Sequence, residues 1–185
     1  MPLPEPLAKR LLEIARTSIV HGLENGAPFP VVLEDEAPTL QETRATFVTL
    51  ELKGKLRGCI GTLEARNPLA EDVSEHAFAA AFEDPRFSPV AAGEAGQLDI
   101  HISILSPPEP LPCTDEADLL AKLRPGRDGL ILQEGRRRAT FLPAVWEDLP
   151  DPRQFLAHLK LKAGLGKDYW SKTLHFWRYE AESVG

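Results

Sequence analysis

Residues 45–63 read ATFVTLELKGKLRGCIGTL, and this stretch predicts a β-hairpin. Its first half is rich in β-branched and aromatic residues, Lys53-Gly54 supplies a two-residue turn, and residues 56–63 return along it. The returning strand contains the motif LRGCIG at residues 56–61, whose two glycines are unusual within a strand. A hairpin at this place indicates a mainly antiparallel sheet.

Helical patterns lie on both sides of this hairpin. Residues 5–23 place apolar side chains three and four apart, and Gly26 follows as a suitable helix end. Residues 27–43 predict a loop with one short extended piece at 31–33. Asn67 and Pro68 predict the cap and first residue of a second helix, which the turn at 84–89 ends. Residues 98–105, LDIHISIL, alternate with period two and predict a third strand.

The second half of the chain repeats this plan. A short helix at 116–123 precedes a hairpin at 129–142, a helix at 151–162 and a strand at 172–179. We therefore expect an α+β fold in which a mainly antiparallel sheet has flanking helices and hairpin–helix–strand occurs twice. We expect one domain over residues 1–185, with halves at about 44–106 and 127–180 that meet at a cleft.

Composition excludes several classes of protein. The chain has 21 Lys and Arg against 28 Asp and Glu, a net charge of −7, which argues against a general nucleic-acid binder. No apolar run approaches the length of a membrane span, and the N-terminal stretch MPLPEPLAKRLLEIAR lacks a signal-peptide pattern. We therefore expect a cytoplasmic protein that binds neither nucleic acid nor membrane.

The two cysteines do not form a metal motif. Cys59 and Cys113 lie far apart in the sequence, and no C-x-x-C, H-E-x-x-H or comparable set accompanies them. We expect no metal and no cofactor. A single disulfide between the two cysteines stays open, although nothing points to an oxidising compartment.

The LRGCIG motif supplies the principal candidate site. Residues i and i+2 of a regular strand share a face, so Arg57 and Cys59 are expected on one face and Leu56 and Ile60 on the other. A guanidinium would favour the thiolate of Cys59, and Gly58 and Gly61 would let a ligand or another backbone approach closely. Cys59 is thus a candidate nucleophile, and Arg57, Gly58 and Gly61 are candidate binding residues. A tightly packed structural strand is the alternative.

Two further residues complete the candidate site. Arg86, in Asp84-Pro85-Arg86-Phe87, could reach the same cleft or could belong to a structural turn. His101 shares a strand face with Asp99 and Ser103, which is most simply a solvated face. Another interpretation places His101 opposite Cys59 on a neighbouring strand, as a Cys–His pair.

The ordered motifs resemble the AMMECR domain family, including the form called AmmeMemoRadiSam system protein A. They are LRGCIG-Thr62, Asp84-x-Arg86-Phe87, ISILSP at 102–107, Gly129-Leu130, TFLP at 140–143, KAGL at 162–165 and Trp170. The resemblance covers nearly the whole chain and implies an α+β fold with a larger and a smaller lobe. It also implies Memo-like and radical-SAM proteins as partners. Lys160 and His101 depart from the family pattern, which often has cysteine and an acidic residue there.

Three functional hypotheses follow. The first is a small-molecule-binding or accessory module acting with Memo-like and radical-SAM partners. The second is a cysteine-dependent enzyme that uses Cys59 beside Arg57. The third is a regulatory protein that senses a small anionic ligand at Arg57. The chain lacks the three-cysteine cluster motif of a radical-SAM enzyme.

Overall fold

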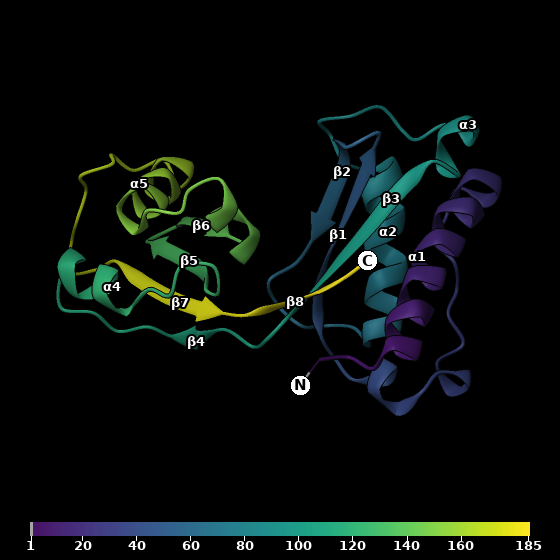
Figure 1. Cartoon of the computed structure of the whole chain (residues 1–185), viewed down its shortest axis with the longest axis horizontal. Coiled ribbons are helices and arrows are strands. Elements are labelled where there is room, and N and C mark those ends of the chain that lie inside the picture. The colour runs from purple at the N-terminus through teal and green to yellow at the C-terminus, as the bar shows by residue number, and fades with distance from the viewer. Residues whose placement is uncertain (1) are drawn as a thin grey trace. The chain divides into compact units, whose positions relative to one another are not determined.

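Two antiparallel sheets organise the chain, which a computed structural model describes over residues 2–185 (Figure 1). Residues 1–105 together with 182–185 form a first compact unit, and residues 106–181 form a second. The α+β fold with mainly antiparallel sheets and flanking helices is confirmed. The predicted halves at 44–106 and 127–180 lie almost wholly in the first and second units respectively, and their meeting at a cleft stays a prediction.

The first unit is a four-stranded sheet with helices on one face. Its strand order is β2-β1-β3-β8, and helices α1 and α2 cover the face that carries Val48 and Leu50 (Figure 1). The elements are α1 (Glu5–Asn25), η1 (Leu33–Asp35), η2 (Pro38–Gln41), β1 (Ala45–Leu52), β2 (Lys55–Gly61), α2 (Leu69–Phe82), α3 (Ala92–Ala95), β3 (Leu98–Leu105) and β8 (Ala181–Val184).

The core of this unit follows the predicted periodicities. Leu11, Ile14 and Ile19 of α1 are buried, and so are the alternate residues Ile100 and Ile102 of β3. Val73 and Ala77 of α2 are buried as well, so both helices bury an apolar stripe on the sheet face, which is the principal source of their stability.

Local backbone chemistry explains where the first-unit elements end. Gly26 adopts the left-handed conformation and closes α1, as the sequence predicts. Pro68 is the cap of α2 rather than its first residue, because its ψ of 143° is outside the helical range. The extended piece predicted at 31–33 is found only in part, because Val32 is extended but Leu33 begins the first of two short 3-10 helices in this loop, and Pro38 starts the second.

The second unit repeats the strand arrangement of the first. Its order β6-β5-β7-β4 mirrors β2-β1-β3-β8, because in each sheet the strand after the helix pairs with the first strand of the hairpin. The predicted duplication of hairpin, helix and strand is confirmed. The elements are β4 (Glu109–Pro110), α4 (Glu116–Lys122), β5 (Gly129–Glu134), β6 (Arg137–Phe141), η3 (Pro143–Glu147), α5 (Pro152–Lys162) and β7 (His175–Tyr179).

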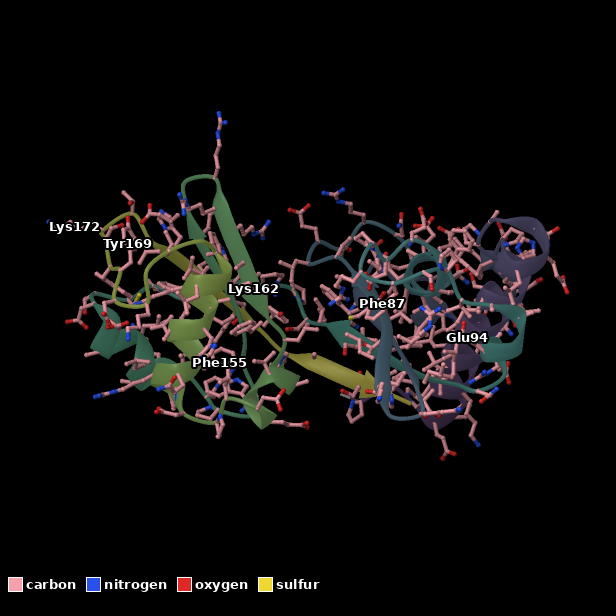
Figure 2. The ribbon with its side chains drawn as sticks, turned by 90° about the horizontal axis from the view of Figure 1, so that it is seen from above. Phe87, Glu94, Phe155, Lys162, Tyr169 and Lys172 are labelled. Carbon is pink, nitrogen blue, oxygen red and sulfur yellow. The ribbon has the colours of Figure 1, made fainter. Side chains whose placement is uncertain are left out.

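An aromatic stack marks the centre of the second core. The rings of Trp146 and Phe155 are parallel with centroids 3.8 Å apart, and both side chains are buried (Figure 2 labels Phe155). Leu130 and Leu132 of β5 and Phe176 of β7 belong to the same cluster. Each unit therefore has its own apolar core.

Candidate functional site

A β-bulge at Arg57 changes the predicted geometry of the LRGCIG strand. Leu50 pairs with Gly58 and Glu51 pairs with Leu56, so Arg57 is an extra residue without a partner on β1. Leu56 therefore lies on the face of Glu51, whereas Ile60 lies on the helix-covered face, opposite Val48. The expectation that Leu56 and Ile60 share a face is wrong, because the bulge breaks the period-two alternation on which it depended.

The guanidinium of Arg57 binds the segment that follows α2. Its Nε and Nη2 donate to the carboxylate of Glu94 at 3.0 and 3.2 Å, and Nη1 donates to the Ser88 carbonyl oxygen at 2.8 Å. A further bond runs from Nη2 to the Pro89 carbonyl oxygen at 3.3 Å. This arrangement lowers the pKa of Glu94, whose position on the segment is labelled in Figure 2. Arg57 thus fastens residues 88–94 to the sheet.

Asp84 and Arg86 occupy the outer side of β2, which is an edge strand. The Asp84 carboxylate accepts the Cys59 backbone N–H at 3.0 Å, and Arg86 Nη2 donates to the Cys59 carbonyl oxygen at 3.4 Å. Arg86 also binds Asp84 through Nε and Nη2, at 3.0 and 2.8 Å. These bonds, the Arg86 contact first, hold the pKa of buried Asp84 well below its usual range. The pair supplies the backbone partners that another strand would supply.

Gly58 and Gly61 mark close backbone approaches. A Cβ at Gly58 would overlap the carbonyl oxygen of Ala80 in α2, and one at Gly61 would overlap the carbonyl oxygen of Thr46 and the Phe47 side chain. The neighbour at both positions is the protein itself. Ligand binding at these glycines stays a prediction.

The Cys59 side chain belongs to a polar row on the sheet face opposite the helices. Thr49 is opposite Cys59 on β2 and opposite His101 on β3, and its hydroxyl lies 3.2 Å from the Cys59 sulfur. Because β1 lies between β2 and β3, Cys59 and His101 are two strand spacings apart, about 10 Å. The structure therefore does not bring them together on neighbouring strands.

His101 has other neighbours. Its Nδ1 lies 3.2 Å from the Gly185 carbonyl oxygen, and its Nε2 lies 3.7 Å from the Glu51 carboxylate. The imidazole is about half exposed, and Cys59 is partly buried. The row can offer a thiol, a hydroxyl and an imidazole to a ligand, but its imidazole does not contact its thiol.

Arg86 is the guanidinium beside Cys59. Its side chain is 56% exposed, it lies 5.4 Å from the ring centre of Phe87, and its Nη1 has no hydrogen-bond partner within residues 2–185 (Figure 2 labels Phe87). An anionic group near Cys59 could bind this nitrogen while Asp84 holds the rest of the guanidinium in place. The sequence pattern predicts this role for Arg57, with Arg86 as a further candidate, because the bulge is not visible in the sequence.

Over residues 2–185, no three His, Cys, Asp or Glu side chains are grouped so that they could hold a metal ion. No helix in that range is both long and apolar enough to cross a bilayer.

Both cysteines are free thiols, and burial raises the pKa of Cys113.

The sequence alone does not reveal Thr49 as a residue of the candidate site. Its position in an alternating strand placed it on the same face as Phe47 and Glu51, but a lone threonine carries no chemical signal. Only the strand order shows that it stands between Cys59 and His101.

The chain is an α+β protein whose two antiparallel sheets share one strand arrangement, with Cys59 on an edge strand of the first sheet. The family model AMMECR1 matches residues 12–184, so the chain belongs to the AMMECR1 family. It is similar to a protein of Methanothermobacter thermautotrophicus, 38% identical over 98% of this chain and 95% of the relative. Protein MJ0810 of Methanocaldococcus jannaschii is 40% identical over 82% of this chain and 78% of the relative.

A solved structure has the same fold. The uncharacterized protein PH0010 from Pyrococcus horikoshii is 33% identical and aligns with a TM-score of 0.89. The alignment covers 98% of this chain and 92% of that protein.

Proposed function

We propose that this protein is a small-molecule-binding or accessory module that works with Memo-like and radical-SAM proteins. The observation that carries the proposal is the environment of the Cys59 thiol, which contacts the Thr49 hydroxyl and lies two strands away from His101. A nucleophilic cysteine normally has a base within hydrogen-bond reach. A row that offers polar groups without such a pair is better suited to binding than to catalysis.

The ligand expected at this site carries a small anionic group. Arg86 Nη1 would bind that group, and the Thr49 hydroxyl and Cys59 thiol would contact the remainder of the ligand. Arg57 is a weaker candidate, because four of its hydrogen bonds already go to Glu94, Ser88 and Pro89.

The partner proposal is supported by family membership and is tested with purified proteins. The full chain is mixed with the Memo-like and the radical-SAM protein of the same host, and complex formation is followed by calorimetry and gel filtration. We expect at least one of them to bind, and Arg86→Gln to weaken any binding that uses this site. The partner proposal fails if neither protein binds at micromolar concentration.

A cysteine-dependent enzyme is the second candidate, because Cys59 is partly accessible and Arg86 lies beside it. Its test is the rate of Cys59 alkylation by iodoacetamide as a function of pH, measured by mass spectrometry on folded protein. Cys113 is an internal control, since burial raises its pKa. A Cys59 rate that rises only above about pH 8 would remove this candidate.

The two arginines make the test specific. If a guanidinium activates the thiol, Arg86→Gln should shift the alkylation profile to higher pH. Arg57→Lys, which alters the bonds to Glu94 rather than the surroundings of the thiol, should leave the profile in place.

A further inference from the structure

A charged cavity in the second unit has no role in the site described above. It has a volume of about 350 Å³ and is lined by residues from three separate segments, near 106–109, 124–127 and 178–180. Its polar lining consists of Ser106, Glu109, Arg124, Arg127, Arg178 and Glu180. This volume is at the lower end of the range for small-molecule sites.

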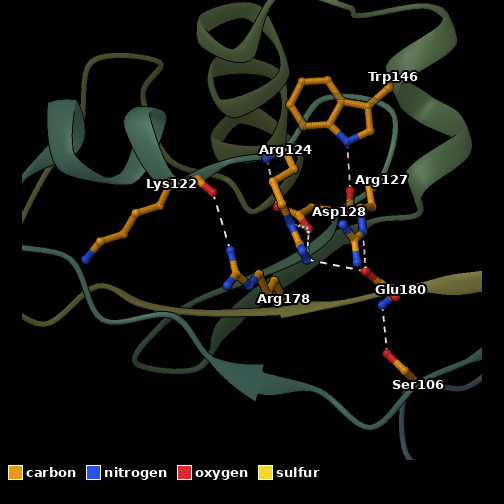
Figure 3. A network of polar contacts seen from close by, with 8 residues as sticks. All are labelled: Ser106, Lys122, Arg124, Arg127, Asp128, Trp146, Arg178 and Glu180. Atoms are coloured by element: carbon orange, nitrogen blue, oxygen red, sulfur yellow. Dashed lines mark hydrogen bonds and ion pairs between the residues drawn. The ribbon is translucent and has the colours of Figure 1, made fainter.

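One wall of the cavity is held by a buried carboxylate. Asp128 is fully buried and accepts the backbone N–H of Arg124 at 2.8 Å and its Nε at 2.8 Å (Figure 3). The Trp146 indole N–H donates to the Asp128 carbonyl oxygen at 2.7 Å and fixes this turn to the core. These bonds hold the Arg124 side chain in place, and the bond with Asp128 raises its pKa.

Glu180 is held in the cavity lining by Ser106 and by two of the arginines. Its backbone N–H donates to Ser106 Oγ at 2.7 Å, and its carbonyl oxygen accepts the Ser106 N–H at 2.8 Å (Figure 3). Glu180 Oε1 accepts Nε of Arg127 and lies 3.5 Å from Nη2 of Arg124. Within the described chain, Glu180 Oε2 makes no hydrogen bond.

Both signs of charge remain available in the cavity. Arg178 uses Nη1 for the Lys122 carbonyl oxygen at 3.4 Å, which leaves its Nε and Nη2 without partners among residues 2–185. Both terminal nitrogens of Arg127 are also without partners there. Glu109, opposite Arg178 in the β4–β7 pairing, forms no hydrogen bond or ion pair in the same range.

The balance of positive and negative charge in the cavity favours one class of ligand. Three guanidinium groups face Glu109, Glu180 and the buried Asp128, so the formal charges cancel. A phosphate would meet the two cavity carboxylates at close range, which is unfavourable. A molecule with both a carboxylate and an ammonium group finds free partners for each.

We propose that this cavity binds a small zwitterion of the free amino acid class. The ligand carboxylate binds Arg178 and Arg127, and its ammonium group binds Glu109 and Glu180. The inference goes beyond the proposed function and uses residues of the other unit, so either can fail without the other.

The test is calorimetric titration of the full chain with each common protein amino acid alone. Propionate, propylamine and inorganic phosphate are the control probes, since each carries one sign of charge. We expect at least one amino acid to bind at least tenfold more tightly than all three controls. The proposal is overturned if no amino acid binds, or if propionate, propylamine or phosphate binds as tightly.

Matched variants locate the binding. Arg178→Gln and Glu109→Gln should each weaken binding of that amino acid at least tenfold. Both side chains make few contacts, so the fold should persist, which circular dichroism checks. Arg153→Gln, which removes an exposed guanidinium of α5 outside this cavity, should change the affinity less than twofold. Unchanged affinity in both cavity variants would overturn the assignment.

Discussion

The carboxylate of Asp84 accepts the backbone N–H of Cys59 at 3.0 Å, on the side of β2 where residues 2–185 supply no neighbouring strand. An edge strand normally leaves such groups open to pairing with other chains. Here Asp84 and Arg86 bind both the N–H and the carbonyl oxygen of Cys59. The Asp-Pro-Arg turn therefore closes the edge of the sheet at its cysteine.

Replacing Asp84 should give a pH-dependent loss of stability. Asp84→Asn removes the charge that binds Arg86, and we expect a loss of roughly 1–3 kcal/mol at neutral pH. Because the folded-state pKa is lowered, this contribution is complete above the unfolded-state pKa of about 4 and is lost as pH falls below it.

Urea unfolding of the wild-type and Asp84→Asn proteins at several pH values measures this difference. The difference in unfolding free energy between the two proteins should be largest above about pH 5 and should decrease below about pH 4. Asp148→Asn, at an exposed position, is the control and should change stability by less than about 0.5 kcal/mol. An equal loss at all pH values would contradict the electrostatic explanation.

Gly58 should not tolerate a methyl group. In Gly58→Ala the added Cβ overlaps the Ala80 carbonyl oxygen, so α2 must move away from the sheet, at a cost of about 1–3 kcal/mol or more. Gly93→Ala is the matched control, because a Cβ at Gly93 meets nothing within 4 Å. Urea unfolding of the two variants should differ by at least about 1 kcal/mol, and equal stability would show that the close approach is not limiting.

The phenol of Tyr179 should ionise at a higher pH in the folded protein than in the unfolded chain. Burial raises its pKa to about 12, and its hydroxyl lies 2.9 Å from the Thr140 hydroxyl. The unfolded chain ionises near pH 10, so the stability from the neutral phenol is complete below about pH 10 and falls as pH rises further.

Near-ultraviolet absorbance of Tyr169→Phe isolates this group, since the chain has two tyrosines. Absorbance is followed as the pH is raised. We expect the midpoint pH of tyrosinate formation in the folded protein to lie well above that in the urea-unfolded protein. Coincident midpoints would show that the Tyr179 phenol is accessible to water.

The hydrogen bond of the Trp146 indole nitrogen should contribute more to stability than the additional ring area of the indole. Trp146→Phe keeps a ring that can stack on Phe155 but removes the bond to the Asp128 carbonyl oxygen, and we expect a loss of about 1–3 kcal/mol. Trp177→Phe is the control, because Trp177 is partly exposed and its indole N–H has no partner within residues 2–185. Chemical unfolding followed by circular dichroism compares them, and equal losses would exclude the hydrogen bond as the cause.

Periodicity predicted most of the sheet but not its irregularities. The alternation in 98–105 identified β3, and Lys53-Gly54 identified the hairpin turn, because these signals are local. The bulge at Arg57 depends on the register with β1 and on the distant Glu94, so nothing in the motif itself reveals it. The four-residue β8 has no pattern long enough to detect.

The geometry of the candidate sites likewise depends on contacts between distant residues, which local sequence patterns do not reveal. Cys59, Arg86 and His101 were named from the sequence, but their mutual positions depend on strand order and on the turn at Asp84. The charged cavity is assembled from Arg124, Arg178 and residues far from both in the chain. Considered one at a time, charged residues in such segments are most simply predicted to lie on the solvent-exposed surface.

The position of β8 in the first sheet has a consequence for synthesis. This strand joins β3 at the sheet edge, yet all of the second unit lies between them in the chain. A ribosome therefore completes the second unit before the residues that finish the first sheet have been made. During that interval β3 is an exposed edge, so nascent chains stalled before residue 181 should be the ones most prone to aggregate or to require a chaperone.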